Sequence, residues 1–303
     1  MLGAMSNDSP FASLLASIKV EEYEVTVLGS TTRYWTYGPD DAEVTVVIAH
    51  GYRGEHHGIE PIIAQLPAIR FVGPDLPGFG ESTPLTEVPH SIDGYAAWLK
   101  EFVDVLGLTD RAVLLGHSFG SIITSSAIAS GMETPALILV NPIAVSGLKG
   151  PRWFVTRLTV AYYELASRLP ERIGRRLLNS WFIVRFMSVS LTKTTDKVLR
   201  QWIHNDHHTF FSRFASRDVV VEAFRASVST DVSVFATRIN VPTLLVAARL
   251  DDITPVSAQF DLQRMIPNAT LCVLDDVGHL IHYEVPELAA KAITSFLAEL
   301  EKR

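Results

Sequence analysis

Short apolar runs alternate with segments of helical periodicity through the first half of the chain. The runs are largely apolar and end in loops rich in glycine or proline, which is typical of buried parallel strands; they cover residues 44–49, 70–73, 112–115 and 136–140. The helical segments 92–106 and 121–130 lie between them, and residues 20–37 predict a hairpin that turns at Gly29-Ser30. This pattern predicts an α/β fold whose mostly parallel central sheet has helices on both faces.

The alternation stops after Asn141-Pro142. Residues from about 145 to about 231 show no convincing strand pattern and consist of helical stretches rich in arginine, leucine and aromatic residues. Strand and helix patterns then resume and cover residues 243–248, 256–265, 271–274 and 286–300. We therefore predict one α/β core formed by residues 1–142 and 236–303, with an all-helical cap inserted at residues 143–235.

The composition predicts a protein with a large buried core and an acidic net charge. Of its 303 residues, 48% are hydrophobic and 19% are charged, and the net charge is −7. This net charge argues against a general nucleic-acid binder, which needs a basic surface for the phosphates, so we expect no nucleic-acid partner. The charge is uneven, because residues 149–217 carry a net +9 and the remaining residues −16. This change supports a structural boundary at the predicted cap.

Cysteine usage and the N-terminal segment bear on the cellular location. Cys272 is the single cysteine, which excludes an internal disulfide and a multi-cysteine metal site. A reducing compartment fits this pattern and we predict a cytoplasmic protein, although a secreted protein without disulfides would have the same composition. Residues 1–20 have a short, serine-interrupted apolar stretch without a basic flank, which predicts neither a signal peptide nor a membrane span.

A candidate nucleophile stands between a predicted strand and a predicted helix. The sequence Gly116-His117-Ser118-Phe119-Gly120 has the form G-x-S-x-G and follows the run at 112–115. In that position the motif predicts a tight turn that exposes the serine hydroxyl above the sheet, with glycines where larger side chains would collide. A chance match is the alternative, because the five-residue pattern is common, but the strand and helix on either side favour a nucleophile.

A serine hydroxyl needs a base to remove its proton, and that base needs an acid to orient it. Of ten histidines, His279 is the one that follows the last predicted strand and precedes the C-terminal helix. Asp251 follows the strand predicted at 243–248, and the order Ser118, Asp251, His279 is the chain order expected when the nucleophile stands in such a turn. Asp252 is the rival candidate for the acid. If it is not the acid, its carboxylate is either solvated or caps the helix that follows.

The oxyanion of an acyl-transfer intermediate requires preorganised backbone N–H donors. We predict Phe119 as one donor, because it directly follows Ser118 at the N-terminus of the helix. The loop after residues 44–49 begins His50-Gly51-Tyr52-Arg53-Gly54 and supplies Tyr52 N–H as the second candidate. Alternatively, Tyr52 only lines the pocket. Its side chain does not distinguish the two roles, because any residue at this position can donate a backbone N–H.

Together these motifs resemble the α/β-hydrolase fold family, in its serine-nucleophile subgroup with a helical cap. The resemblance covers residues 44–142 and 236–303 and rests on five motifs in the family's order: His50-Gly51, the turn at 75–82, Gly116 to Gly120, Asp251-x-x-x-Pro255, and Gly278-His279-x4-Glu284-x-Pro286. It implies the same triad and oxyanion donors and favours Asp251 over Asp252, because the four-residue step to Pro255 is the family's usual spacing. The turn at 75–82 is structural in that family.

The predicted cap carries aromatic and basic residues that suggest a lipid-like substrate. We expect most of its apolar residues to pack on the core and the remainder to line an acyl-chain pocket, and replacing Trp181 or Phe182 would distinguish the two roles. A solvated face is the default interpretation of its arginines, and contact with an anionic lipid surface is the alternative; these are Arg152, Arg157, Arg168, Arg172, Arg175 and Arg176.

Other motifs receive less specific interpretations. His204, His207 and His208 have helical spacing, and we favour a polar cap face over a metal site because serine chemistry requires no metal. His56-His57 and Arg53 are expected near the pocket mouth, where Arg53 has a substrate carboxylate or a surface ion pair as its partner. Gly78-Phe79-Gly80 lacks the setting of a dinucleotide fingerprint, so we expect neither a cofactor nor a metal.

The leading functional hypothesis is therefore a serine hydrolase of carboxylic esters with an apolar acyl group, such as a monoacylglycerol-like lipid. Similar capped relatives hydrolyse a carbon–carbon bond of a dienoate with the same triad, which is the second hypothesis. A non-catalytic binding protein on this fold is a third, but it has no need of all three triad residues.

Overall fold

The computed structural model describes residues 9–149 and 153–302 and contains one eight-stranded sheet. Its strands lie in the order β1-β2-β4-β3-β5-β6-β7-β8. They span β1 Val20–Val27, β2 Ser30–Tyr37, β3 Thr45–Ala49, β4 Arg70–Pro74, β5 Ala112–His117, β6 Leu137–Val140, β7 Thr243–Ala248 and β8 Ala269–Leu274. β1 and β2 form the expected antiparallel hairpin, β2 pairs antiparallel with β4, and all other pairs are parallel. The predicted α/β fold is thus confirmed.

Helices cover both faces of the sheet. Successive side chains of each buried strand point to opposite faces, so each buried strand packs against helices on both sides. Leu114 of β5 packs in the cluster that includes α3 (Ile92–Val105), α4 (Phe119–Ala129) and α10 (Val256–Met265). Leu115 packs on the other face with α2 (Glu60–Ile63) and α12 (Pro286–Leu300). All six residues of β5 are buried, which explains why its first four residues are all apolar rather than alternating with polar ones.

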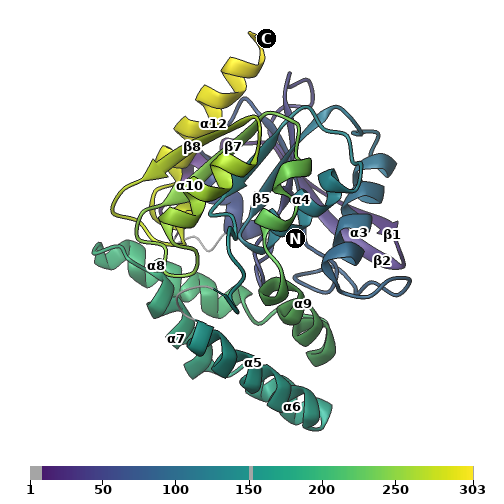
Figure 1. The fold of residues 1–303 in the computed structure, drawn as a ribbon, viewed down its shortest axis with the longest axis vertical. Helices are drawn as coiled ribbons and strands as arrows, with labels where there is room; N and C mark the ends of the chain where they lie inside the picture. Colours follow the sequence, from purple (N-terminus) through teal and green to yellow (C-terminus); the bar gives the residue numbers. More distant parts are fainter. Residues whose placement is uncertain (1–8, 150–152, 303) are drawn as a thin grey trace.

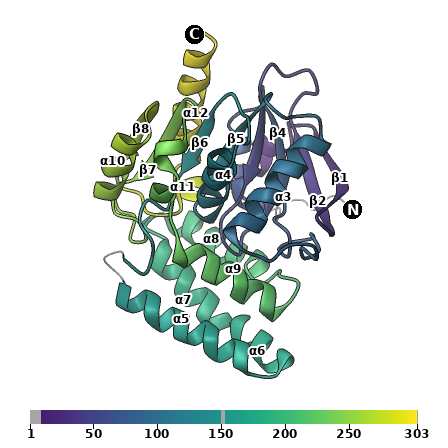
Figure 2. The same ribbon diagram turned by 45° about the vertical axis from the view of Figure 1, so that its right-hand side comes forward.

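Five helices lie between β6 and β7 in the sequence. They are α5 Trp153–Arg168, α6 Glu171–Leu178, α7 Trp181–Leu191, α8 Lys197–Phe210 and α9 Arg217–Ser229. Figures 1 and 2 show α5, α6 and α7 at one end of the molecule, with α8 and α9 nearer to the sheet and the C-terminal end of α12 at the opposite end. We call α5 to α9 the inserted helices. The expectation of helices without a regular strand between about 145 and 231 is confirmed for the described residues of this segment.

Four short helical elements were not expected from the sequence. They are α1 (Ala12–Leu15), η1 (His56–Ile59), α2, which follows η1 directly, and α11 (Ile281–Glu284); the 3-10 turns Val232–Val234 and Ala236–Arg238 lead into β7. Each has only three or four residues, too few for helical periodicity to register. Among the described residues, no helix combines the length and the apolar character needed to cross a membrane.

Candidate active site

Ser118 occupies a strained turn between β5 and α4. Its backbone has φ 51° and ψ −114°. Residues other than glycine rarely adopt this conformation, which costs about 1–3 kcal/mol. A Cβ on Gly120 would overlap the carbonyl oxygen of Ala49, and one on Gly116 would lie 2.7 Å from the carbonyl oxygen of Gly120. The two glycines therefore permit the tight turn, and the turn leaves Ser118 partly exposed in a pocket.

The three predicted triad side chains lie in hydrogen-bonding sequence. His279 Nε2 is 2.8 Å from Ser118 Oγ, and His279 Nδ1 is 2.7 Å from Asp251 Oδ2. The other carboxylate oxygen of Asp251 accepts hydrogen bonds from the backbone N–H groups of Ile253 (2.7 Å) and Thr254 (3.2 Å). These bonds fix the carboxylate, which in turn favours the His279 tautomer that has a lone pair on Nε2.

The rival acid Asp252 faces a different partner. Its Oδ2 lies 2.5 Å from Lys193 Nζ, in the segment between α7 and α8, and both side chains are partly exposed. Asp251, in contrast, is buried beside His279. The geometry thus brings Asp251 rather than Asp252 to the imidazole, and Asp252 ties the inserted helices to the loop after β7.

The loop after β3 passes close to Ser118 and contains Tyr52. Tyr52 and Ser118 line the same pocket, and the Tyr52 ring contacts the Phe119 ring edge to face with centroids 6.3 Å apart. Phe119 is the first residue of α4, so its N–H belongs to the helix turn that lacks intrahelical acceptors. His50 orders the loop, because its Nδ1 donates to the Gly51 carbonyl (2.8 Å) and its Nε2 accepts from Leu76 N–H (2.8 Å).

Arg53 has neither of the roles that the sequence suggested. The side chain is only 1% exposed, and its guanidinium donates to the backbone carbonyls of Phe211 (2.8 Å) and Leu178 (3.1 Å) in the inserted helices. It also lies over the Phe214 ring, 5.4 Å from its centroid. Expecting a substrate carboxylate or a surface ion pair was wrong, because the inserted helices cover Arg53 completely. Instead it joins those helices to the loop that carries Tyr52.

Asn141 is a site residue that sequence analysis did not identify. Its Nδ2 donates to the backbone carbonyls of His279 (2.7 Å) and Gly278 (3.3 Å), and its Oδ1 accepts from Ala248 N–H (3.1 Å). Asn141 is fully buried, with φ 44°, at the end of β6. A polar residue directly after an apolar strand, beside the strand that carries Ser118, was the signal that could have found it.

Apolar and polar side chains both line the pocket around Ser118, and we call the two groups of lining residues the apolar wall and the polar wall. Its cavity volume is about 140 Å³. The apolar wall includes Met187 and Leu191 of α7, Phe211, Ile59 and Leu280, and the polar wall includes Glu55, His117, His282 and Tyr283. Burial holds the pKa of His117 and of His282 well below the usual range, so both rings are neutral near pH 7. No arginine or lysine occurs among the described residues that line this pocket.

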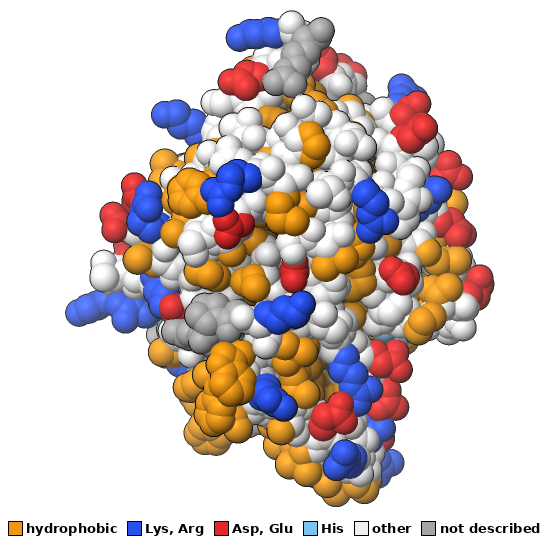
Figure 3. Space-filling model, in the orientation of Figure 1, with side chains coloured by type: hydrophobic (Ala, Val, Ile, Leu, Met, Phe, Trp, Pro, Cys, Tyr) orange, Lys and Arg blue, Asp and Glu red, His pale blue; other side chains and the backbone are white. Residues whose placement is uncertain are grey.

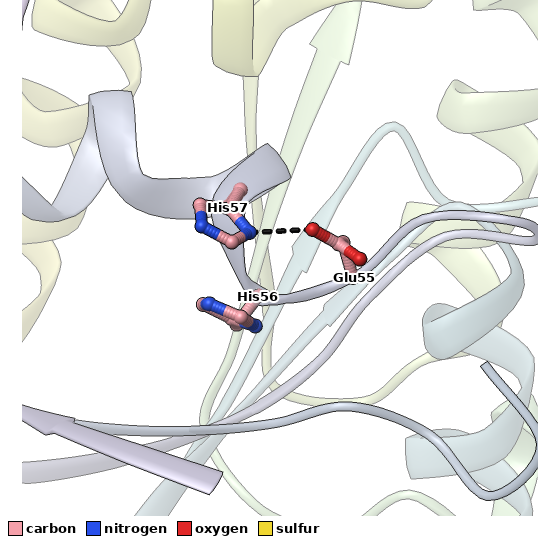
Figure 4. Close-up of side chains that lie close together, drawn as sticks. All are labelled: Glu55, His56 and His57. Carbon is pink, nitrogen blue, oxygen red and sulfur yellow. Dashed lines mark hydrogen bonds and ion pairs between the residues drawn. The ribbon is translucent and has the colours of Figure 1, made fainter. Parts of the chain in front are cut away.

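Glu55, His56 and His57 form a buried cluster beside the pocket (Figure 4). Their potential ligand atoms lie within 4.8 Å of one another, but both Nδ1 atoms already bond to carboxylates: His56 to Asp75 (2.8 Å) and His57 to Glu55 (2.5 Å). Burial lowers the pKa of His56 to about 4. We therefore assign the histidines a structural role. Expecting them at the pocket mouth was wrong, because both are buried and neither lines the pocket.

The second oxygen of Glu55, Oε2, is buried and has no hydrogen-bond partner among the described residues. The residue itself lines the pocket that contains Ser118. An unpaired buried carboxylate oxygen costs free energy, so Glu55 has the capacity for one further hydrogen bond.

The three histidines of α8 do not form a polar outer face. His204 and His207 are buried, and their Nδ1 atoms lie 2.6 Å and 2.7 Å from the same hydroxyl, Ser188 Oγ of α7. Burial lowers the pKa of His207 to about 3. His208 stacks on the Trp181 ring with centroids 4.9 Å apart. The expectation of a polar face was wrong, because polar histidines here hold α7 against α8.

Trp181 and Phe182, for which a pocket wall and core packing were the two expectations, have neither role. Trp181 and Phe182 are 57% and 77% exposed, and neither lines the Ser118 pocket. They also do not pack on the core, so both interpretations offered for these two residues were wrong. Their helix, α7, contributes Met187 and Leu191 to the pocket instead. Arg152, one of the arginines discussed above, lies outside the described residues.

The parallel sheet, the strained serine turn and the hydrogen-bonded Ser118, His279 and Asp251 define the class of α/β hydrolases. The family model of the alpha/beta hydrolase family matches residues 46–292, which is most of the chain. The chain belongs to this family and is a hydrolase.

Individual relatives differ in the bonds that they cleave. A 2-hydroxy-6-oxononadienedioate/2-hydroxy-6-oxononatrienedioate hydrolase of Pseudomonas putida is 27% identical over 269 residues, covering 84% of this chain and 87% of the relative. Human monoacylglycerol lipase ABHD6 is 26% identical over 267 residues, covering 84% and 76%. An esterase structure from Exiguobacterium antarcticum has a TM-score of 0.75 and 19% identity, covering 92% of this chain and all of the esterase, which is a likeness of fold alone.

Proposed function

We propose that this hydrolase cleaves carboxylic esters with an apolar acyl group through an acyl-enzyme on Ser118. The observation that supports it is the sequence of contacts from Ser118 Oγ through His279 to Asp251, located in a pocket with an apolar wall. In this proposal Ser118 is the nucleophile, His279 the general base and Asp251 the acid that orients the imidazole. Tyr52 and Phe119 donate their backbone N–H groups to the oxyanion.

The proposed reaction has two similar halves. His279 Nε2 removes the proton of Ser118 Oγ as the oxygen attacks the ester carbonyl carbon, and the carbonyl oxygen becomes an anion held by the two N–H donors. His279 then gives the proton to the departing alcohol, which leaves an acyl ester on Ser118. Water, deprotonated by the same imidazole, attacks this ester and releases the carboxylic acid and free Ser118.

The charge of the pocket favours an ester over a dienedioate. A substrate with carboxylates requires arginine or lysine, which bind carboxylate oxygens through charge-assisted hydrogen bonds. The described lining residues include neither, and the nearby Arg53 is occupied by backbone carbonyls. Glu55 on the polar wall would repel a second carboxylate. The carbon–carbon hydrolase hypothesis is therefore the weaker of the two.

We also propose that the inserted helices act as a cap that binds the acyl group, with residues 143–235 as the cap and the rest of the chain as the core. Met187 and Leu191 of α7 contribute apolar side chains to the pocket that Ser118 lines. The cavity of about 140 Å³ is smaller than the roughly 300–1,000 Å³ of drug-sized ligand sites. A short acyl group is accommodated as the pocket stands, and a long chain requires α7 to move outward.

The polar wall is proposed to bind the alcohol portion of the ester. Glu55 Oε2 lacks a partner among the described residues and accepts a hydrogen bond from an alcohol hydroxyl beyond the one that is esterified. A partial ester of a polyol, such as a monoacylglycerol, has both the apolar acyl chain and the free hydroxyls for the two walls.

The deciding experiment is labelling with a fluorophosphonate probe, together with hydrolysis of p-nitrophenyl esters, for the wild type and Ser118→Ala. Ser126→Ala is the matched control, because this buried hydroxyl of α4, the helix that follows Ser118, has no hydrogen-bond partner among the described residues. We expect Ser118→Ala to lose labelling and several orders of magnitude in turnover, and the control to retain both. A dienoate substrate is assayed alongside. Its cleavage without ester cleavage would overturn the ester proposal, and no labelling or turnover of either kind would favour a binding protein.

A further inference from the structure

Large apolar side chains are exposed on three consecutive helices, α5, α6 and α7. Phe182 and Phe186 are 77% and 70% exposed, and Phe154 is 61% exposed. The other exposed members are Trp153, Val155, Leu158, Leu165, Ile173, Trp181 and Val189. Figure 3 shows hydrophobic side chains gathered at the end of the molecule where these helices lie in Figure 1. We call these residues the apolar end.

An exposed cluster of this kind requires an explanation. Single exposed apolar residues are normal on a protein surface, but contiguous patches mark binding surfaces for proteins or membranes. α5 contacts α6 and α9, α6 contacts α9, and α7 contacts α8, so each helix is folded onto the protein by another face. The apolar end therefore faces outward while the helices that carry it are already packed.

The charge of the same helices is strongly positive. Residues 153–191 contain six arginines and no lysine, against two carboxylates, in a protein of net charge −7. Both carboxylates are paired with arginines of α9: Glu164 with Arg225 at 2.6 Å and Glu171 with Arg217 at 3.3 Å. Five of the six arginines are exposed, so the helices that carry the apolar end have an excess of positive charge at their surface.

We propose that the apolar end docks the protein on an anionic lipid surface. Aromatic and aliphatic side chains enter the boundary between lipid headgroups and acyl chains, and the arginines pair with lipid phosphates. A second copy of the chain is the less suitable occupant, because a two-fold interface would bring the same arginine-rich surface against itself. Charge complementarity thus selects the lipid.

Docking in this orientation connects the membrane to the candidate active site through one helix. Phe182, Phe186 and Val189 of α7 face outward, whereas Met187 and Leu191 of the same helix line the pocket of Ser118. A lipid contact that moves α7 outward would widen the small cavity. This part of the inference rests on the proposed function, whereas the docking itself does not.

Vesicle co-sedimentation of the full chain tests docking without depending on catalysis, since it is measured on Ser118→Ala protein. The vesicles contain phosphatidylcholine alone or with phosphatidylglycerol. Phe182→Glu/Phe186→Glu is the test variant, and Leu288→Glu is the matched control, an exposed apolar residue on α12, outside the inserted helices. Circular dichroism verifies that each variant is folded.

We expect binding to vesicles with phosphatidylglycerol, a loss of at least about tenfold in the test variant, and no loss in the control. Binding should weaken in about 1 M NaCl, where the Debye length is about 3 Å. Equal binding by the test variant and the wild type, or no binding to anionic vesicles, would overturn the proposal. The proposal would also be overturned if sedimentation velocity without vesicles showed a dimer that only the test variant abolishes. That result would assign the surface to a second copy of the chain. Ester hydrolysis by the wild type in solution reports separately on the proposed function.

Discussion

Asn141 Nδ2 donates a hydrogen bond to the backbone carbonyl of His279 at 2.7 Å, while Asn141 Oδ1 accepts from Ala248 N–H. This one buried side chain therefore connects the loop of the proposed base to the end of β7, the strand after which Asp251 follows. The imidazole is thus positioned twice, through its ring by Asp251 and through its backbone by Asn141.

Asn141→Asp tests this positioning role, because it keeps the size and the acceptor oxygen but removes the donor to His279. We expect kcat to fall by about 10- to 100-fold with KM nearly unchanged, since the proposed base is displaced while the pocket wall is untouched. Asn268→Asp is the control, because Asn268 donates to a backbone carbonyl, that of Asn240, at an exposed site. An equal loss in both variants, or a changed KM alone, would contradict the role.

The assignment of the proposed acid predicts a difference between two adjacent carboxylates. Asp251→Asn removes the acceptor that favours the His279 tautomer with a free Nε2, and a loss of about 10⁴ in kcat is expected by analogy with other triads. Asp252→Asn loses only a partly exposed ion pair with Lys193 and should change stability by about 0–1 kcal/mol. Steady-state kinetics of both variants on one ester provide the measurement, and similar mild effects would refute Asp251 as the acid.

Glu55→Gln tests the proposed recognition of an alcohol hydroxyl. The amide keeps the shape and one acceptor oxygen but loses the charge, and a hydrogen bond to a charged group contributes about 1.5–3 kcal/mol. We therefore expect kcat/KM for a monoacylglycerol to fall by about tenfold or more, and kcat/KM for an ethyl ester of the same acid to stay within a few-fold. A parallel decline for both substrates would show that Glu55 supports the site only structurally.

Buried neutral histidines predict a loss of stability in acid. Burial lowers the pKa of His56 to about 4 and of His207 to about 3, whereas an unfolded histidine has a pKa of about 6.5. Between these values the unfolded chain binds the additional protons, so stability is lost as pH falls below about 6.5 and the loss continues towards pH 4. Burial raises the pKa of Asp206 to about 6, which acts in the opposite direction over part of this range.

His207→Asn isolates one of these contributions, because an amide can replace the hydrogen bond to Ser188 Oγ but does not titrate. The midpoint of urea unfolding should decline less between pH 7 and pH 4 in the variant than in the wild type. Each unit by which the pKa of His207 in the folded protein lies below its value in the unfolded chain corresponds to about 1.4 kcal/mol in the free energy of unfolding. If the urea midpoint declined equally with pH in the two proteins, protonation of His207 would not lower the stability of the folded protein.

The sequence predicted the sheet and the three proposed triad residues because each leaves a local signal. Apolar runs mark buried strands, and Ser118, Asp251 and His279 each follow a strand in a fixed order. The roles of Arg53, His204 and His207 were mispredicted for one shared reason: a polar residue was assumed to face solvent. Each is buried by a contact distant in sequence, such as Arg53 with Phe211, and no local pattern reports such a contact.

The aromatic residues of α7 illustrate the same limit for apolar side chains. Trp181, Phe182, Phe186 and Met187 are equally apolar in the sequence, but only Met187 lines the pocket. Which side of α7 faces Ser118 depends on how the helix rests on α8, through Ser188 and the two histidines that it contacts. Helical periodicity shows which residues share a face of a helix. When every face carries apolar residues, however, it does not show which face points inward.

The final prediction concerns the length of the acyl group. If Met187 limits the pocket, kcat/KM for p-nitrophenyl esters should rise from acetyl to a short acyl chain, by up to about 0.8 kcal/mol for each buried methylene, and then decline when the cavity of about 140 Å³ is full. Met187→Ala removes part of this wall and should move the optimum to a longer chain. Phe182→Ala is the matched control on the same helix, because Phe182 is exposed and does not line the pocket, so its optimum should stay where it is in the wild type. An unchanged optimum in Met187→Ala, or an equal change in Phe182→Ala, would place the acyl group away from α7 and leave the proposed roles of Ser118, His279 and Asp251 unaffected.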